Sequence, residues 1–166
     1  VLLFYPATTV LIAMLLFQRE KNWKNKTLLA ESEKKYRLLF EQTPIPMWIY
    51  DLDTLSFLEV NQAAIEHYGY SREEFLSMTI KDIRPEEDIP KLLERLKSHN
   101  GNHQTSGDWR HRKKNGEIIF VQLASHETIY HDRLARHVTI NDVTQLIKSH
   151  EIISQKEREF REIFNS

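Results

Sequence analysis

Residues 112–144 read RKKNGEIIFVQLASHETIYHDRLARHVTINDVT, and this segment sets the architecture of the whole chain. Asn115-Gly116 is a strong hairpin signal, because both residue types accept positive φ. Two long strand-like runs follow, at residues 118–129 and 134–143, and a short turn joins them. With a further run around Trp109, they predict three consecutive antiparallel strands.

Shorter elements are expected before these strands. Residues 47–50 and 55–60 are apolar runs that predict a first hairpin. Asn61 is a good N-cap for a helix over residues 62–68, and Gly69 can close that helix in the left-handed conformation. Ser71 and Glu74 have the spacing of a capping box, which predicts a short helix over residues 73–77.

Two longer helices complete the folded unit. A leading helix is expected over residues 31–42, before the prolines that follow it. Asp88 is expected to cap a second helix, in which Ile89, Leu92, Leu93 and Leu96 form one apolar stripe. The order of helix, two strands, short helices and three strands lacks βα alternation. It therefore predicts an α+β domain with one antiparallel sheet.

Residues 31–145 resemble a PAS domain. The motifs that carry the resemblance are FLEVNQAA at 57–64, YGYSREEF at 68–75, DIRPEED at 82–88, RKKNG at 112–116 and NDVT at 141–144. The resemblance implies a PAS fold, in which helices cover one face of a five-stranded antiparallel sheet. It also implies a module for sensing and dimerisation.

A PAS fold implies a pocket between the sheet and the helices, which an unknown small ligand could fill. The candidate lining residues are Tyr68, Phe75, Leu92, Leu96, Trp109, Val121, Leu123 and Ile140. The same residue types fill an ordinary core, and this alternative is favoured.

Asp142 and Thr144 match the end of the last strand in the family. Short polar side chains can bind the backbone where a strand turns into a connector helix, which would couple the sheet to that helix. A plain helix cap is an alternative that does not exclude coupling.

Cofactor and metal chemistry is not expected. The chain has no cysteine, so a flavin-cysteine adduct cannot form. Among the eight histidines, His99, His103 and His111 lie close in sequence, but no carboxylate stands at ligand spacing, and surface positions are expected for them. In haem-binding relatives the axial histidine follows the Arg-Pro pair. Residues 84–88 offer carboxylates there instead, which argues against histidine-ligated haem.

No catalytic residue is expected either. Residues 149–152, SHEI, are similar to the phosphoacceptor box of a histidine kinase, but the proline that follows in that box is missing. The chain also lacks a glycine-rich segment for ATP. Nucleic-acid binding is disfavoured, because 23 basic and 24 acidic residues leave a net charge of −1 and no basic stripe.

The two ends suggest a part of a larger membrane-bound protein. Residues 1–17 are uncharged and apolar, and a membrane span cut at its start is favoured over a cleaved signal peptide. The juxtamembrane linker, residues 18–30, carries Arg19, Lys21, Lys24 and Lys26, which predicts an inner-membrane protein with this domain in the cytoplasm.

Residues 33–40, EKKYRLLF, resemble residues 157–164, EREFREIF. Unless the likeness is chance, residues 146–166 hold a connector helix and the start of a second PAS module. Leu146, Ile153 and Phe160 fall seven apart, which favours a parallel homodimer over a helix packed on its own domain.

This arrangement is similar to the middle of a bacterial membrane-bound sensor histidine kinase. The expected role is to sense or relay a signal to a downstream PAS or kinase module, and through the parent to a response regulator. The alternatives are the PAS module of a membrane-bound cyclic-dinucleotide synthase and a dimerisation spacer that binds no ligand.

Overall fold

The computed structural model describes residues 5–98 and 104–164, which divide into two units, Val1–Glu41 and Gln42–Ser166. The first unit is almost entirely helix α1 (Tyr5–Gln42). From Tyr5 onwards this helix runs without a break through the described part of the apolar segment, the linker and the expected leading helix. In it, Arg37 Nη2 lies 3.1 Å from Glu33 Oε1, one turn away.

A helix that spans a bilayer needs about 20 predominantly apolar residues. Within residues 5–98 and 104–164, none is both long and apolar enough to span a membrane. The span expected at residues 1–17 is thus not found among the described residues, and its first four residues lie outside them.

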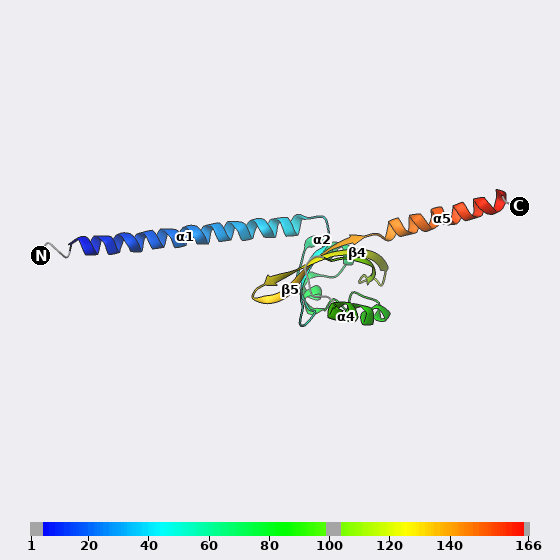
Figure 1. Cartoon of the computed structure of the whole chain (residues 1–166), viewed down its shortest axis with the longest axis horizontal. Helices are drawn as coiled ribbons and strands as arrows, with labels where there is room; N and C mark the ends of the chain where they lie inside the picture. The colour runs from blue at the N-terminus through cyan, green and yellow to red at the C-terminus, as the bar shows by residue number, and fades with distance from the viewer. Residues whose placement is uncertain (1–4, 99–103, 165–166) are drawn as a thin grey trace. The chain divides into compact units, whose positions relative to one another are not determined.

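The second unit is built on one sheet, in the order β2-β1-β5-β4-β3 (Figure 1). The strands are β1 (Met47–Asp51), β2 (Phe57–Val60), β3 (Gln104–Arg112), β4 (Ile118–Tyr130) and β5 (Arg133–Asp142). Every neighbouring pair is antiparallel. The predicted α+β architecture with a five-stranded antiparallel sheet is therefore confirmed.

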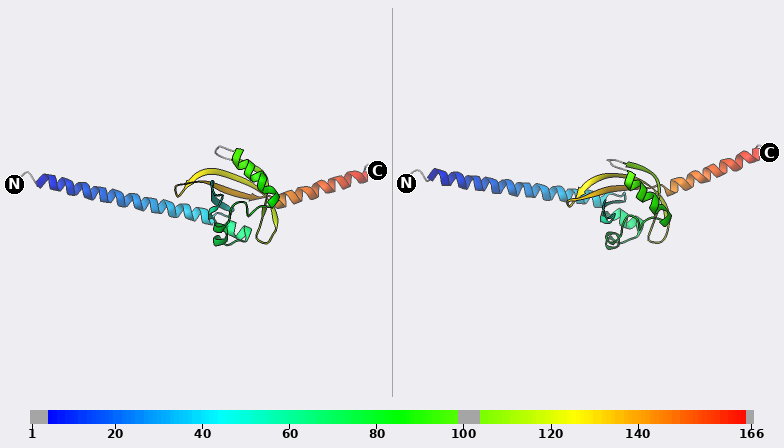
Figure 2. Two further views of the ribbon diagram at one scale, coloured as in Figure 1. Left: turned by 90° about the horizontal axis from the view of Figure 1, so that it is seen from below. Right: turned by 60° about the horizontal axis from the view of Figure 1, so that its bottom comes forward.

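Helices cover the buried face of this sheet (Figure 2). They are α2 (Gln62–Tyr68), α3 (Arg72–Ser77), the 3-10 turn η1 (Glu86–Asp88) and α4 (Ile89–Ser98). Tyr68, Phe75 and Leu92 from these helices share one apolar core with Trp48 and Val138 of the sheet. A last helix, α5 (Thr144–Phe164), follows β5 directly.

Three of the four expected helix ends are as predicted. Asn61 caps α2, Gly69 ends it with a φ of 80°, and Ser71 forms the capping box with Glu74. The prediction that Asp88 caps α4 is wrong. The Asp88 carboxylate instead accepts hydrogen bonds from Arg110 at 2.7 and 2.9 Å, and α4 continues directly from η1.

Asn61 connects more than its own helix, because its side chain is fully buried. Its Oδ1 accepts from the backbone nitrogens of Met47 and Ala64, at 2.9 and 3.0 Å, and its Nδ2 donates to the Ile45 carbonyl oxygen at 2.9 Å. One amide group therefore joins the start of β1 to the start of α2.

We expect Asn61→Ala to lower the free energy of unfolding by about 2–4 kcal/mol, because it leaves several buried backbone groups without partners. Urea denaturation of the variant and the parent chain measures this difference. Gln62→Ala, at the neighbouring exposed position, is the matched control and should cost far less. An Asn61→Ala loss no larger than the control's would show that the amide is not needed.

Candidate functional site

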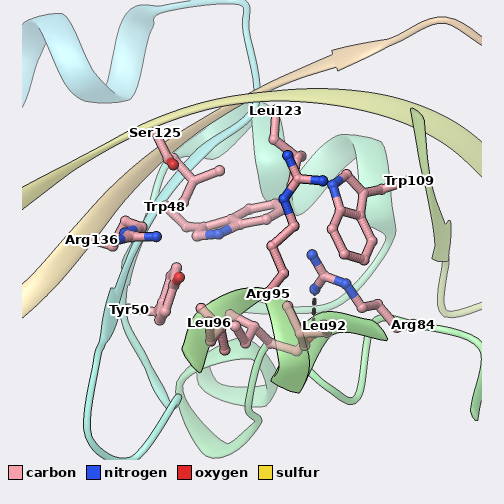
Figure 3. Close-up of a pocket in the computed structure, with 12 residues that line it drawn as sticks. Trp48, Tyr50, Arg84, Leu92, Arg95, Leu96, Trp109, Leu123, Ser125 and Arg136 are labelled. Carbon is pink, nitrogen blue, oxygen red and sulfur yellow. Dashed lines mark hydrogen bonds between the residues drawn. The ribbon is translucent and has the colours of Figure 1, made fainter. Parts of the chain in front are cut away.

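A cavity of about 50 Å³ lies between the sheet and helix α4 (Figure 3). Its apolar wall consists of Trp48, Ile80, Leu92, Leu96, Trp109, Leu123 and Val138. Its polar wall consists of Tyr50, Arg84, Arg95, Ser125 and Arg136. Three guanidinium groups in one small, largely apolar space are the distinctive feature of this site.

The structure separates the expected lining residues into two groups. Leu92, Leu96, Trp109 and Leu123 line the cavity. Tyr68, Phe75, Val121 and Ile140 do not line it; they lie in the tightly packed core, each no more than 1% exposed. The sheet face thus contains a filled core and, beside it, a cavity.

Sequence reasoning missed the whole polar wall. A signal was present for Arg136, because residues 136, 138 and 140 alternate onto the buried face of β5. Arg84 stands in the DIRPEED motif, but nothing in its local pattern marks an arginine that the fold buries. Charged residues are seldom buried, so an apolar pattern alone does not find them.

Arg136 is held in place by both neighbouring strands. In the register of the sheet it stands opposite Tyr50 of β1 and Glu127 of β4. Its Nη2 lies 2.6 Å from Glu127 Oε1, which compensates its charge. Burial raises the pKa of the Tyr50 hydroxyl, so Tyr50 remains a neutral hydrogen-bonding group.

Arg84 is more deeply buried and is not compensated in this way. Only 3% of it is exposed, and its Nη1 donates to the Ile80 carbonyl oxygen at 2.6 Å. Its guanidinium carbon lies 5.3 Å from the centre of the Trp109 ring. Among the residues that the structure describes, no carboxylate forms an ion pair with it, and its Nε has no hydrogen-bond partner. Burial lowers the pKa of Arg84 to about 10, which still leaves it charged at neutral pH.

His111 contradicts its expected surface position, since it is fully buried. Its Nδ1 lies 2.7 Å from the Tyr68 hydroxyl oxygen. Burial, together with the charge of Arg84, holds the pKa of His111 well below its ordinary value, so the imidazole is neutral. His99 and His103 lie outside the described residues, and within those residues no group of three potential metal ligands occurs.

Asp142 and Thr144 lie at the junction of β5 and α5, where four elements meet. Asp142 Oδ1 accepts from the Thr144 backbone nitrogen at 2.9 Å, and its Oδ2 lies 3.1 Å from His67 Nε2 on α2. Thr144 Oγ1 accepts from the Phe120 backbone nitrogen of β4 at 2.9 Å. The pair therefore shapes the start of α5 and also contacts β4 and α2.

Comparison with known proteins agrees with this geometry. The family model described as "PAS fold" matches residues 34–143. The chain belongs to the PAS family. A PAS domain of an HTR-like protein from Haloarcula marismortui has a TM-score of 0.62 and 18% identity, covering 72% of this chain and 98% of its own. A PAS domain from a two-component sensor histidine kinase has a TM-score of 0.57 and 25% identity, covering 68% of this chain and 98% of its own.

Two curated relatives are much longer than this PAS chain. A methyl sulfide methyltransferase-associated sensor of Methanosarcina acetivorans is 25% identical over 124 residues, which are 73% of this chain and 12% of the relative. A probable diguanylate cyclase of Escherichia coli is 25% identical over 158 residues, which are 93% of this chain and 14% of the relative. The chain thus spans only a small part of the length of either.

The buried neutral His111 gives the domain a pH dependence. Because its pKa is lower in the folded than in the unfolded chain, protons bind preferentially to the unfolded chain below pH about 6.5. We expect the free energy of unfolding to fall as the pH drops from about 6.5 towards 5, with a share of up to about 1.4 kcal/mol per pH unit from this residue.

Urea denaturation between pH 7.5 and 5 measures this slope. His111→Gln retains an amide for the Tyr68 hydroxyl. It should reduce the slope by the share that one bound proton contributes. His150→Gln, at an exposed position of α5, should retain the slope of the parent chain. An undiminished slope in His111→Gln would contradict the assignment of a neutral imidazole.

Proposed function

We propose that this chain is the signal-sensing and relay module of a membrane-bound sensor histidine kinase. A ligand or a conformational signal at the cavity alters the sheet, and β5 transmits the change to α5 and on to a downstream PAS or kinase module. The observation that supports this most directly is that one strand, β5, supplies residues both to the cavity and to the start of α5. Arg136 and Val138 of β5 line the cavity, and Asp142 at its end holds the start of α5.

The register of β5 makes this coupling physically reasonable. Arg136, Val138, Ile140 and Asp142 alternate onto one face of the strand. The cavity is therefore separated from the junction by only a few residues of a hydrogen-bonded strand. A change in the twist of β5 would displace Asp142 relative to Phe120 and His67, which alters the contacts that hold α5.

The nature of the parent is inferred from relatives. A solved PAS domain at 25% identity comes from a two-component sensor histidine kinase, and one curated relative is named a sensor. In such a parent, the output is ATP-dependent phosphotransfer to a response regulator. The module itself supplies no catalytic residue in this proposal.

A parallel homodimer is part of the proposal. Leu146, Ile153 and Phe160 repeat every seven residues along α5 and are between 57% and 68% exposed in the single chain. Apolar side chains with this spacing are buried when two identical helices pair in register. Residues 146–166 would then form the connector and begin a second PAS module.

The proposed location is the cell inner membrane, with the PAS domain in the cytoplasm. It rests on the sequence of the first unit, where the uncharged residues 1–17 are followed by Arg19, Lys21, Lys24 and Lys26.

A second output has specific support. The probable diguanylate cyclase of Escherichia coli matches 93% of this chain. The alternative parent is thus a membrane-bound cyclic-dinucleotide synthase, in which the same input module controls a different reaction.

We expect Asp142→Ala to leave the fold intact and to change the output of the full-length parent at least about threefold. The loss of its contacts with Thr144 and His67 frees the start of α5. The measurements are circular dichroism for the fold, and autophosphorylation and cyclic-dinucleotide formation for the output. Whichever product forms identifies the parent's reaction.

The matched control is Asp53→Ala, an exposed aspartate in the turn between β1 and β2, which should leave the output unchanged. If Asp142→Ala folds and signals as the unmodified parent does, the junction does not relay the signal.

A further inference from the structure

We propose that the cavity binds a small organic carboxylate, whose charged end lies against Arg84 and whose apolar end packs on the leucines of α4 and β4. This inference rests on the proposed sensing function and names the chemical class that the same cavity recognises.

The first argument is the charge of the cavity wall. A buried cation is costly unless an anion compensates it. Arg136 has Glu127 at 2.6 Å. Arg84 is 3% exposed and forms no ion pair with a carboxylate in the described part of the chain. Asp88, the acidic residue whose charge acts on Arg84, is held by two hydrogen bonds from Arg110. The missing counter-charge points to an anion from outside the protein.

The second argument is the set of donors that face the cavity. Figure 3 shows the guanidinium groups of Arg84 and Arg95 beside the Trp109 ring, with Arg136 and Tyr50 across the cavity. The Nε of Arg84 is buried and has no hydrogen-bond partner among residues 5–98 and 104–164. A guanidinium group presents parallel N–H donors that match the two oxygens of a carboxylate. The site therefore offers hydrogen bonds as well as charge.

The third argument is the size and polarity of the remaining wall. About 50 Å³ is several times the space that one water molecule requires, but far below the roughly 300–1,000 Å³ of sites for larger ligands. Leu92, Leu96 and Leu123 form an apolar side that a fully hydrated ion such as phosphate would not use. A short aliphatic chain with one carboxylate matches both walls, because its carboxylate can bind the arginines and its chain can pack on the leucines.

The test is a binding experiment on the full chain at pH 7.5 and constant ionic strength. Acetate, propionate and butyrate are titrated by calorimetry and by thermal unfolding, with chloride and inorganic phosphate as comparison anions. We expect one of the carboxylates to raise Tm by about 5–10 °C at 100 times its Kd, and chloride and phosphate to have no such effect.

Two variants assign the binding to Arg84. Arg84→Met removes the charge and retains an unbranched apolar stem, and it should weaken carboxylate binding about 10- to 100-fold. Lys91→Met is the matched control. The Lys91 ammonium lies 4.8 Å from the centre of the same Trp109 ring but does not line the cavity, so this variant should bind as the parent does.

Three results would overturn the inference: no carboxylate binds selectively, phosphate binds as well as the carboxylates, or Arg84→Met binds normally while remaining folded. Asp142→Ala separates this inference from the proposed function. Because Asp142 does not line the cavity, this variant should still prefer carboxylates to phosphate and should still depend on Arg84 for binding. A cavity that rejects carboxylates, in a parent whose output still depends on Asp142, would refute the ligand class and retain the relay.

Discussion

The pairing of β5 with β1 on one side and β4 on the other fixes where the sheet's cavity residues and Asp142 stand. In this register Arg136 stands between Tyr50 and Glu127, Val138 stands between Trp48 and Ser125, and Asp142 stands opposite Val121. A shift of one residue would turn the cavity face of β5 outwards and would move Asp142 away from His67. The same backbone hydrogen bonds thus define the sheet wall of the cavity and the start of α5.

Arg84 shows that this domain is not built for maximal stability alone. An apolar side chain of similar size would fill the space near Trp109 without burying a charge. The fold instead buries a guanidinium group that has a backbone carbonyl and an indole ring beside it, and no carboxylate in the described part of the chain. Such an arrangement fits the proposal that a ligand supplies the counter-charge.

The sequence predicted those features that depend on neighbouring residues. The strand hairpins, the Asn61 cap, the Gly69 terminus and the Ser71 capping box are all set within a few positions of the chain. Features that join distant segments were missed or mistaken. The local pattern predicts a cap at Asp88, but its partner Arg110 lies 22 residues away, and His111 pairs with Tyr68 across 43 residues. The three cavity arginines follow the same rule, because only the packing of α4 and the segment before it against the sheet brings them together.

The central claim is that the cavity and the β5–α5 junction respond together. Amide NMR of the ¹⁵N-labelled chain tests it most directly, with the backbone amides of Phe120 and Thr144 as reporters of the junction. On titration with a carboxylate that binds, the account predicts that both signals move with the same saturation curve as the indole signal of Trp109. Trp109 and other cavity signals that saturate while Phe120 and Thr144 stay fixed would contradict it.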